Sequence, residues 1–319
     1  MISVFGRFSS RGWHRSSVGK ERMEMVTFYR RLPRFEYVKP GSMGEALGIL
    51  ESGDEGRVRV FAGGTDVIPK LKGRVMKAPE VLVDLKGISD LHYVSYEEGS
   101  GLRIGALATI FEVGHAPLVK EGFELLSQAA RAIASTQVQN RGTIVGNICN
   151  AVPSADSAPA LLCLGAKVVC VSKNGDREMD VEGFFRGPNE TVLGVGEMVK
   201  EIRVPKTAEG SRGVYLKLSP RSKMDLAVVG VGAMVRAENG VFKEAKIGLG
   251  AVAPTPMRAK KAEGVLVGTK VSDEVIERAA KAASEESRPI DDHRASAEYR
   301  RMMVEVLVRR AIHQCVTDG

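Results

Sequence analysis

The sequence Ala62-Gly63-Gly64-Thr65-Asp66 is the stretch around which the chain is organised. It follows an alternating, strand-like run at Val58–Phe61 and precedes a short apolar turn at residues 67–71. Adjacent glycines permit positive φ angles and let the backbone approach a ligand closely. A strand, a glycine turn and a helix start with Thr65 or Asp66 as N-cap together form a typical anion site. A plain glycine turn between two elements is the alternative.

A second glycine stretch, Thr143-Ile144-Val145-Gly146-Asn147, lies further along the chain. It is followed by the segment PSADSAP at residues 153–159 and by an apolar helical run that contains Leu161, Leu162 and Leu164. Both glycine stretches therefore lead from a turn into a helix. Two such turns are suited to bind the two ends of one ligand that contains a diphosphate.

The two motifs together resemble the FAD-binding subunit of the molybdenum hydroxylases, which include the medium subunits of xanthine dehydrogenase and carbon monoxide dehydrogenase. The resemblance rests on AGGTD at 62–66, TIVGN at 143–147 and PSAD at 153–156, and it extends from about Phe28 to the C-terminus. It implies an α+β fold. A two-subdomain FAD-binding domain of the vanillyl alcohol oxidase (PCMH) type is expected first, followed by a smaller α+β domain with a three-stranded antiparallel sheet.

The resemblance also predicts where the domains divide. Residues 26–205 form the expected PCMH-type domain, and residues 206–319 the C-terminal domain like that of carbon monoxide dehydrogenase flavoproteins. Residues 1–25 are interpreted as a disordered or non-native extension. They are rich in Ser and Arg and lack the continuous apolar region of a secretory signal. Their composition permits a mitochondrial transit peptide, but the family pattern begins at about Met25.

Hydrophobic periodicity and caps predict the individual elements. Capping boxes begin helices at Ser42-x-x-Glu45 and Thr109-x-x-Glu112. Further helices are expected at 123–133, 272–284 and 294–314, and strands at 58–61, 81–85, 102–106, 167–171, 201–204, 214–218, 226–235 and 245–252. The letters Gly248-x-Gly250-x-x-Ala253 fit a dinucleotide fingerprint, but Pro254 and Pro256 prevent a helix from opening there.

Composition excludes several classes of protein. The chain has 319 residues, of which 44% are hydrophobic, so it is long enough for two domains. No apolar run approaches the roughly 20 residues of a membrane-spanning helix. The four cysteines form no C-x-x-C pair, so a zinc site or iron–sulfur cluster within this chain is not expected. Free thiols suit a reducing compartment, and the cytoplasm is the expected location.

The positive net charge does not indicate nucleic-acid binding. The first 25 residues carry five basic and two acidic side chains, and so contribute +3 of the net +7. The remaining +4 is spread over a sequence in which both signs alternate. This pattern is typical of a solvated surface rather than of a phosphate-binding stripe.

The resemblance implies a set of FAD-binding residues and no catalytic or metal-binding residue. The N–H groups of both glycine loops would bind the pyrophosphate, with the Thr143 hydroxyl and the Asn147 amide as side-chain partners. The complete predicted set is Ala62, Gly63, Gly64, Thr65, Asp66, Val67, Ile133, Thr143, Val145, Gly146, Asn147, Asp156, Val199, Lys217 and Leu226.

The resemblance implies particular roles for five members of this set, and four of them also have simpler interpretations. Asp156 matches an aspartate that binds the sugar-alcohol region of the flavin, but it also suits a helix N-cap. Ile133 and Val199 match apolar positions beside the cofactor, and either fits a hydrophobic core. Lys217 matches a lysine that stabilises negative charge on the reduced flavin; a solvated strand lysine is the alternative. Leu226 matches a position that faces the isoalloxazine, and an aliphatic residue there favours a xanthine-type enzyme over a carbon monoxide-type one.

The resemblance implies that the chain is the FAD-binding electron-transfer subunit of a heteromeric molybdenum hydroxylase. Its partners would be a [2Fe–2S] small subunit and a molybdopterin-containing large subunit in a dimer of heterotrimers, with NAD+ or another acceptor receiving the electrons. A nicotinate or carbon monoxide dehydrogenase subunit, a stand-alone PCMH-fold flavin oxidoreductase and a basic nucleic-acid-binding module are the alternatives.

Overall fold

Two hydrophobic cores organise the part of the chain that the computed structural model describes, which comprises residues 31–53, 56–222 and 224–317. The first core is built mainly from residues before Pro205, and the second from the segments that follow. The described residues from Leu32 onward belong to one compact unit. The predicted N-terminal extension, residues 1–25, lies outside the described residues.

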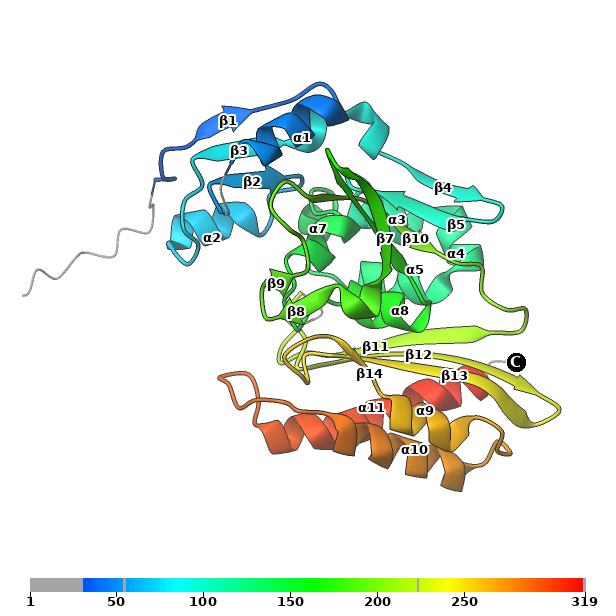
Figure 1. The fold of residues 1–319 in the computed structure, drawn as a ribbon. Coiled ribbons are helices and arrows are strands. Elements are labelled where there is room, and N and C mark those ends of the chain that lie inside the picture. Colours follow the sequence, from blue (N-terminus) through cyan, green and yellow to red (C-terminus); the bar gives the residue numbers. More distant parts are fainter. Residues whose placement is uncertain (1–30, 54–55, 223, 318–319) are drawn as a thin grey trace, which may run out of the picture. The chain divides into compact units, whose positions relative to one another are not determined.

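A small parallel sheet carries the first glycine loop. Its strands are β1 (Glu36–Val38), β2 (Val58–Phe61) and β3 (Val81–Asp84), in the order β1-β3-β2. Helices α1 (Met43–Glu51) and α2 (Val67–Gly73) connect them. The loop therefore leaves the carboxyl end of β2 and leads directly into α2, as the sequence predicted (Figure 1).

An antiparallel sheet of five strands makes up the rest of the first core. Its order is β4 (Val94–Glu97), β5 (Gly101–Gly105), β10 (Met198–Val204), β6 (Lys167–Ser172) and β7 (Gly175–Asp180). Six helices come between β5 and β6: α3 (Ile110–His115), α4 (Pro117–Gly122), α5 (Glu124–Arg131), α6 (Thr136–Gln139), α7 (Ile144–Cys149) and α8 (Ser157–Cys163). A short hairpin of β8 (Phe185–Gly187) and β9 (Glu190–Thr191) precedes β10.

The two predicted capping boxes differ in the structure. At α3 both bonds are present, since Thr109 Oγ1 accepts from the Glu112 N–H and the Glu112 carboxylate accepts from the Thr109 N–H. At α1 the Ser42 side chain accepts from the Glu45 N–H, but the Glu45 carboxylate accepts from the N–H of Gly41 instead of Ser42. The predicted helix start is confirmed there, but the predicted donor to the Glu45 carboxylate was wrong, because Gly41 donates in place of Ser42.

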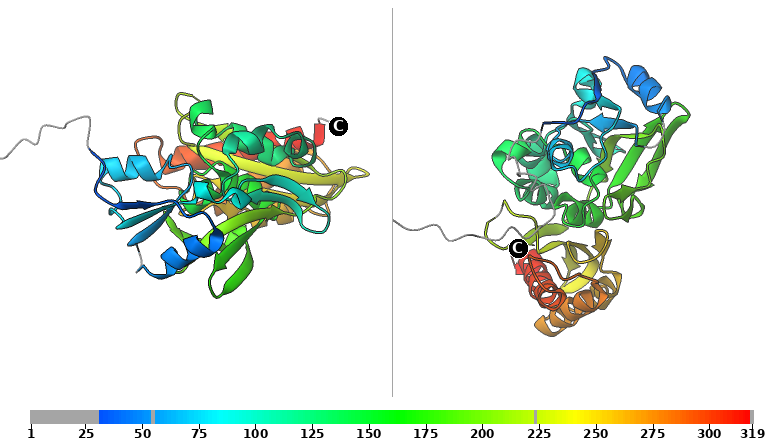
Figure 2. Two further views of the ribbon diagram at one scale, coloured as in Figure 1. Left: turned by 90° about the horizontal axis from the view of Figure 1, so that it is seen from above. Right: turned by 90° about the vertical axis from the view of Figure 1, so that its left-hand side faces the viewer.

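The second core lies between a sheet and three helices. Strands β11 (Arg212–Leu218), β12 (Val229–Glu238), β13 (Val241–Gly250) and β14 (Met257–Arg258) are antiparallel in that order. Helices α9 (Lys260–Leu266), α10 (Asp273–Glu286) and α11 (Ala297–Thr317) cover one face of this sheet (Figures 1 and 2). The prediction of three strands was incomplete, because β14 has only two residues and leaves no alternating pattern in the sequence.

Two predicted bounds in this half were also wrong. The strand predicted from residue 226 begins at Val229, because residues before it belong to a turn in which Asp225 accepts from the N–H groups of Arg221 and Ser222. The helix predicted from residue 294 begins at Ala297. A turn precedes it, in which the Asp292 carboxylate accepts from the N–H groups of Arg294 and Ala295.

Glycines allow α8 to lie directly on the other face of the sheet. A Cβ atom added to Gly248 would lie 2.3 Å from the carbonyl oxygen of Pro159, and one added to Gly232 would lie 3.0 Å from the same oxygen. The G-x-G pattern at residues 248–250 therefore serves close packing of a helix, in agreement with its rejection as a dinucleotide motif. Within the described ranges, no helix is long and apolar enough to cross a membrane.

Candidate functional site

The two glycine loops, far apart in sequence, lie against each other. A Cβ atom on Gly63 would lie 1.9 Å from the carbonyl oxygen of Arg141, the residue that leads into the second loop. A Cβ atom on Gly142 would lie 3.2 Å from the Thr65 hydroxyl. Only glycine can occupy position 63 without moving the backbone, and at position 142 a Cβ atom would crowd the Thr65 side chain. The contact explains why both loops need their glycines and places their ligand-facing groups in one region.

A cavity of about 390 Å³ lies at this junction, and every predicted cofactor residue lines it. Both loops contribute to its wall. The residues from other elements that line it are Ile133, Asp156, Val199, Lys217 and Leu226. The sequence reasoning missed Arg59, Lys70 and Asn150, which line the same cavity. Asn150 lies three residues after the second motif, and Lys70 is four residues after Asp66, so helical spacing was the available signal.

Contacts with Phe61 and Lys86 fix the conformation of the first loop. Gly64 adopts φ +76°, and a Cβ atom there would lie 2.4 Å from the Phe61 ring. Lys86 donates to the carbonyl oxygen of Ala62 at 2.9 Å and pairs with Asp84 at 2.8 Å. These contacts hold the loop in a conformation that a residue with a side chain adopts only with strain.

Asp66 occupies the N-cap position of α2, but its side chain makes no capping bond. Instead, its carboxylate accepts a hydrogen bond of 2.8 Å from the Asn150 amide. Burial raises the pKa of Asp66, and the neighbouring Lys70 and the Asn150 bond oppose that rise. The side-chain cap expected at residues 65–66 was therefore replaced by a contact with the second loop.

The second loop uses its polar side chains in two ways. Thr143 is the N-cap of α7, and its hydroxyl oxygen accepts from the Gly146 N–H at 2.9 Å. The amide oxygen of Asn147 accepts from the Ser157 hydroxyl at 2.6 Å. That bond fixes the orientation of the Asn147 amide, so its nitrogen is the atom presented for a ligand. The loop is thus ordered by its own side chains.

Asp156, Lys217 and Tyr215 form a buried cluster that joins the two cores. The Asp156 carboxylate accepts from the Tyr215 hydroxyl at 2.6 Å and from Lys217 Nζ at 2.8 Å, and Lys217 also donates to the carbonyl oxygen of Ala132 at 2.9 Å. Burial raises the pKa of Asp156, although Lys217 and Tyr215 act in the opposite direction. Asp156 is the N-cap residue of α8 by position, but its side chain makes no capping bond, so only the side-chain part of that interpretation is wrong. Lys217 is 7% exposed, so it is not the solvated lysine of the alternative interpretation.

Comparison with known proteins identifies the family. Residues 33–207 match the FAD binding domain in molybdopterin dehydrogenase, and residues 214–315 match the CO dehydrogenase flavoprotein C-terminal domain. The chain belongs to the FAD-binding subunits of the molybdenum hydroxylases. It is 35% identical over 282 residues to the glyceraldehyde dehydrogenase medium chain of Sulfolobus acidocaldarius, covering 88% of this chain and 98% of that one.

Two further relatives agree with this assignment. The putative xanthine dehydrogenase FAD-binding subunit of Escherichia coli is 29% identical over 281 residues, covering 88% of this chain and 95% of that subunit. A solved chain of the carbon monoxide dehydrogenase from Hydrogenophaga pseudoflava superimposes with a TM-score of 0.86 at 36% identity, covering 89% of this chain and 98% of that one. The predicted fold class and FAD as cofactor are confirmed, and the chain is an oxidoreductase subunit.

The chemistry of the cavity wall suits FAD. Backbone N–H groups of the two loops provide donors for a diphosphate, and Arg59 and Lys70 add positive charge to the cavity wall. Ile133 and Val199 are buried, so their core role and their place in the cavity wall hold together. FAD, when bound, supplies the capacity to accept and release electrons, and the protein binds and orients it.

Cys149 also lines this cavity, and burial raises the pKa of its thiol to about 12, with Cys170 as a smaller contribution. A thiol with so high a pKa stays protonated at neutral pH and is a poor nucleophile. Cys149 therefore serves as a small residue that fills space beside the loop. Within the described residues, no group of three or more potential metal ligands occurs.

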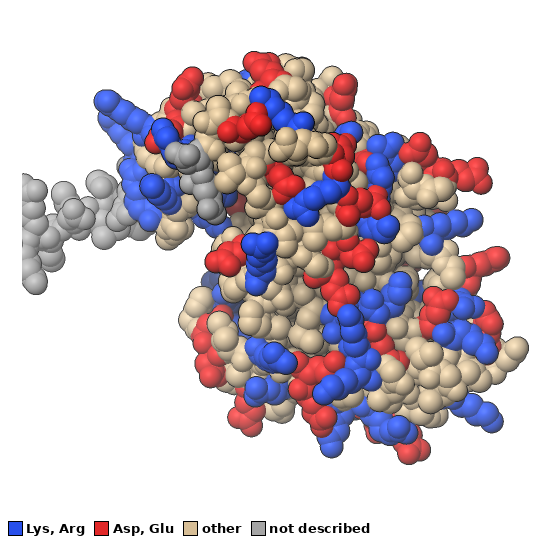
Figure 3. Space-filling view, in the orientation of Figure 1, with Lys and Arg blue, Asp and Glu red and all other residues tan. Residues whose placement is uncertain are grey.

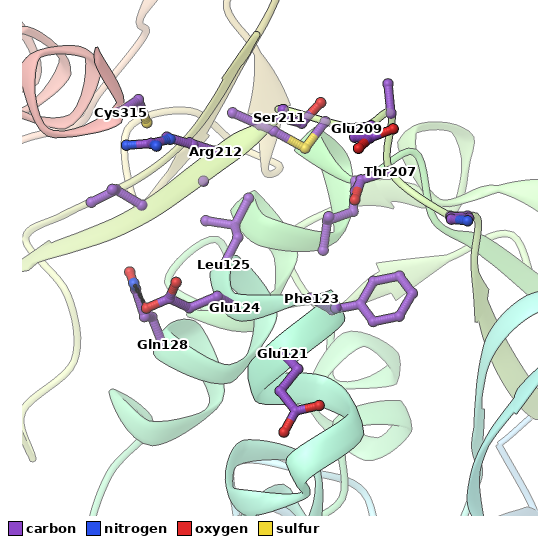
Figure 4. A pocket seen from close by; sticks show the side chains of 18 of the residues that line it. Glu121, Phe123, Glu124, Leu125, Gln128, Thr207, Glu209, Ser211, Arg212 and Cys315 are labelled. Carbon is purple, nitrogen blue, oxygen red and sulfur yellow. Dashed lines mark hydrogen bonds between the residues drawn. The ribbon is translucent and has the colours of Figure 1, made fainter. Parts of the chain in front are cut away.

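A second cavity, of about 970 Å³, lies between α5, β11 and the segment at residues 206–211 (Figure 4). None of the predicted cofactor residues lines it. Its labelled charged residues include Glu121, Glu124, Glu209 and Arg212, so both signs are present. Gln128 in its wall accepts from the backbone N–H of Tyr215 at 2.9 Å. Strand β11 contributes to both cavities, with residues 212–214 in the wall of this one and Lys217 in the wall of the glycine-loop cavity. Of these two cavities, the one at the glycine loops contains the predicted cofactor residues.

Proposed function

We propose that this chain is the FAD-binding electron-transfer subunit of a heteromeric molybdenum hydroxylase. In this proposal the chain receives electrons from a [2Fe–2S] small subunit and passes them to NAD+ or another acceptor. A molybdopterin-containing large subunit carries out substrate oxidation, and the complex is a dimer of heterotrimers in the cytoplasm. The observation that supports this most strongly is the convergence of both glycine loops and Lys217 on one cavity.

The proposed roles of the residues follow from their geometry. The two loops bind the diphosphate through backbone N–H groups, with the Thr143 hydroxyl and the Asn147 amide as further partners. Lys217 supplies positive charge near the ring and is oriented by Asp156 and the Ala132 carbonyl. The exposed Leu226 covers the ring from the opposite half of the molecule. We also place the domain boundary at residues 205–206, in keeping with the two cores.

A xanthine-type enzyme is the first candidate for the whole complex, because Leu226 is aliphatic at the position that faces the ring. A carbon monoxide-type enzyme is the second candidate, because the solved relative with 36% identity is a carbon monoxide dehydrogenase. The substrate is bound by the large subunit, so the complex decides between them. Purified complex that reduces an artificial acceptor with xanthine but not with carbon monoxide would support the first candidate, and the reverse result the second.

The flavin site itself can be tested by visible absorption of the full chain after FAD has been added. Gly64→Val forces a side chain onto a backbone with φ +76° and into the Phe61 ring. Gly146→Val places a Cβ atom 2.9 Å from the Thr143 hydroxyl that caps α7. Both variants should lose bound flavin, whereas Gly44→Ala, at an α1 position with open space around it, should retain it.

Two results would contradict the proposal. One is undiminished flavin binding in both loop variants. The other is failure of the wild-type chain to bind FAD both alone and in the co-expressed complex, since the complex supplies any partner that the site needs. Co-purification of a subunit with the absorption of a [2Fe–2S] cluster tests the electron donor separately.

A further inference from the structure

A polar cluster beside the cofactor cavity connects three segments that are distant in sequence. Lys70 Nζ donates to the amide oxygen of Asn150 at 2.5 Å and to that of Asn189 at 2.8 Å. The Asn150 amide nitrogen in turn donates to the Asp66 carboxylate at 2.8 Å. Each group in the chain Asp66–Asn150–Lys70–Asn189 thus uses its donors and acceptors in a consistent direction.

The segments that this cluster connects are the ones that surround the cavity. Asp66 and Lys70 belong to the first loop and α2, and Asn150 follows α7 of the second loop. Asn189 lies in the turn of the β8–β9 hairpin with φ +62°, and its N–H donates to the Ala151 carbonyl oxygen at 2.8 Å. The hairpin therefore binds the end of the second loop through its backbone and reaches α2 through its side chain.

The cluster complements the other contact between the loops. At Gly63 and Arg141 the loops touch through backbone atoms, a steric contact that prevents closer approach. The polar cluster includes Asp66 at the start of α2 and Lys70 within α2. Its hydrogen bonds oppose separation of the same two segments. The backbone contact limits how close the loops can come, and the hydrogen bonds limit how far apart they can move. Together they set the distance between the loops that a ligand bound by both must span.

The charges of the cluster are balanced within it. Burial lowers the pKa of Lys70, opposed by Asp66, while burial raises the pKa of Asp66, opposed by Lys70. Arg59 lies near Lys70 and further lowers its pKa. Removing Asp66, Asn150 or Lys70 would take a hydrogen-bond partner or a counter-charge from a partly buried charged group, so the remaining groups would rearrange.

We propose that Lys70, Asn150 and Asp66 form an inter-loop clasp that sets the separation of the two glycine loops and thereby controls how tightly FAD is retained. The proposal rests on the proposed function, because it concerns the same cofactor. Lys70 and Asn150 are positioning residues in it, acting on FAD through the loops. Loss of the clasp lets the loops separate, so FAD dissociates faster while the chain remains folded.

The first test measures the dissociation constant and the dissociation rate of FAD in the full chain by flavin fluorescence. Asn150→Ala and Lys70→Ala should each weaken binding roughly tenfold to hundredfold, as expected for loss of a hydrogen bond to a charged group. The matched control is Lys72→Ala, an exposed lysine of the same helix, which should leave both values unchanged. Thermal unfolding of the apoprotein is recorded for every variant.

An exchange of partners separates positioning from general structural damage. Asn150→Asp alone brings two carboxylates together and should weaken FAD binding. Adding Asp66→Asn restores a donor–acceptor pair, because the new amide at position 66 donates to the new carboxylate at position 150, which still accepts from Lys70. The double variant should recover most of the affinity that the single variant lost.

The outcomes distinguish this proposal from the proposed function. If wild type binds no FAD, alone or in the co-expressed complex, the proposed function fails. If wild type binds FAD and the clasp variants release it at the same rate, the clasp is wrong and the flavin site stands. A clasp variant that lowers apoprotein stability without changing FAD release, or a double variant that shows no recovery, also contradicts the clasp.

Discussion

Two buried carboxylates show how the surroundings of a single residue set its charge. Glu201 is fully buried, yet its pKa is lowered, because the donors Arg103, Tyr93 and Arg203 outweigh the effect of burial. Asp156 is also buried, but there burial outweighs its donors and the pKa is raised. The difference follows from the number of cationic donors, which sequence position alone does not reveal.

Glu201→Gln should destabilise the fold in a pH-dependent manner. Glu201 accepts bonds of 2.6 Å from Tyr93, 2.8 Å from Arg103 and 2.8 Å from Arg203. We expect the free energy of unfolding at pH 7 to fall by about 2 kcal/mol, because both arginines are partly solvated and the loss stays below that of a dry ion pair.

The pH dependence of this loss follows from the lowered pKa of Glu201. Its contribution is present above the ordinary glutamate pKa and disappears as the pH falls through the lower folded value. Wild type and variant should therefore converge in acid when urea unfolding is compared at a series of pH values. Glu97→Gln is the control, since Glu97 also pairs with Arg103 but is exposed, and should cost less than about 0.5 kcal/mol. Equal losses in both variants would contradict the prediction.

At the scale of elements, local rules predicted what local bonds determine. The capping box at Thr109 and the turn-to-helix character of both glycine loops follow from neighbouring residues, and both were found. The strand β14 and the β8–β9 hairpin were missed, because strands of two or three residues have no recognisable period. A local rule made a side-chain cap one of two interpretations of Asp156, but the carboxylate instead accepts from Lys217, which is 61 residues away.

The sequence predicted residues that line the candidate site, but it did not predict the hydrogen bonds that link those residues to other segments. Every residue taken from the two motifs and the family resemblance lines the cavity. The bonds of Lys70 to Asn150 and Asn189 span 80 and 119 residues, and no spacing rule reaches so far. The hairpin residue Asn189 has a role only because the fold brings it to α2.

The packing of α8 on the second sheet gives a prediction for a single element. Gly248→Ala would place a Cβ atom 2.3 Å from the Pro159 carbonyl oxygen, so α8 must move away from β13. Since Asp156 directly precedes α8, FAD affinity should fall together with stability, by roughly 1–3 kcal/mol in unfolding free energy as for other overpacked cores. Urea unfolding and flavin titration measure the two effects.

The control for this prediction is Gly264→Ala in α9, where a Cβ atom meets nothing within 4 Å. A helix-interior glycine replaced by alanine should leave FAD binding unchanged and raise stability by up to about 1 kcal/mol. If Gly248→Ala behaves like this control, the glycine is not needed for close packing of α8.

At the scale of the whole molecule, the cavity that we propose for the flavin depends on both cores at once. Strand β11 belongs to the second sheet, but Tyr215 and Lys217 on it bind Asp156 and Ala132 of the first half, and the N–H of Tyr215 binds Gln128. Lys and Arg gather over the region of β1 and α2, and elsewhere on this face both signs are interspersed (Figure 3).

Tyr215→Phe tests the connection between the two halves. The Tyr215 hydroxyl stabilises the ionised form of Asp156, whose folded pKa is already raised by burial. Without this donor the pKa of Asp156 rises further, so the ionised carboxylate costs the folded variant more than the folded wild type at pH 7. In acid both proteins carry Asp156 protonated, and this difference disappears. The loss of unfolding free energy should be about 1–2 kcal/mol at neutral pH and smaller near pH 4.

The same substitution should also increase the FAD dissociation rate, because Asp156 orients Lys217 toward the cavity. Tyr299→Phe, at an exposed position of α11, is the control and should change neither quantity. Urea unfolding at the two pH values and flavin release measure the two effects on the same preparations. A loss that is independent of pH would show that Tyr215 contributes packing alone. Loss of stability with unchanged flavin release would show that the bridge between the cores is separate from the cofactor site.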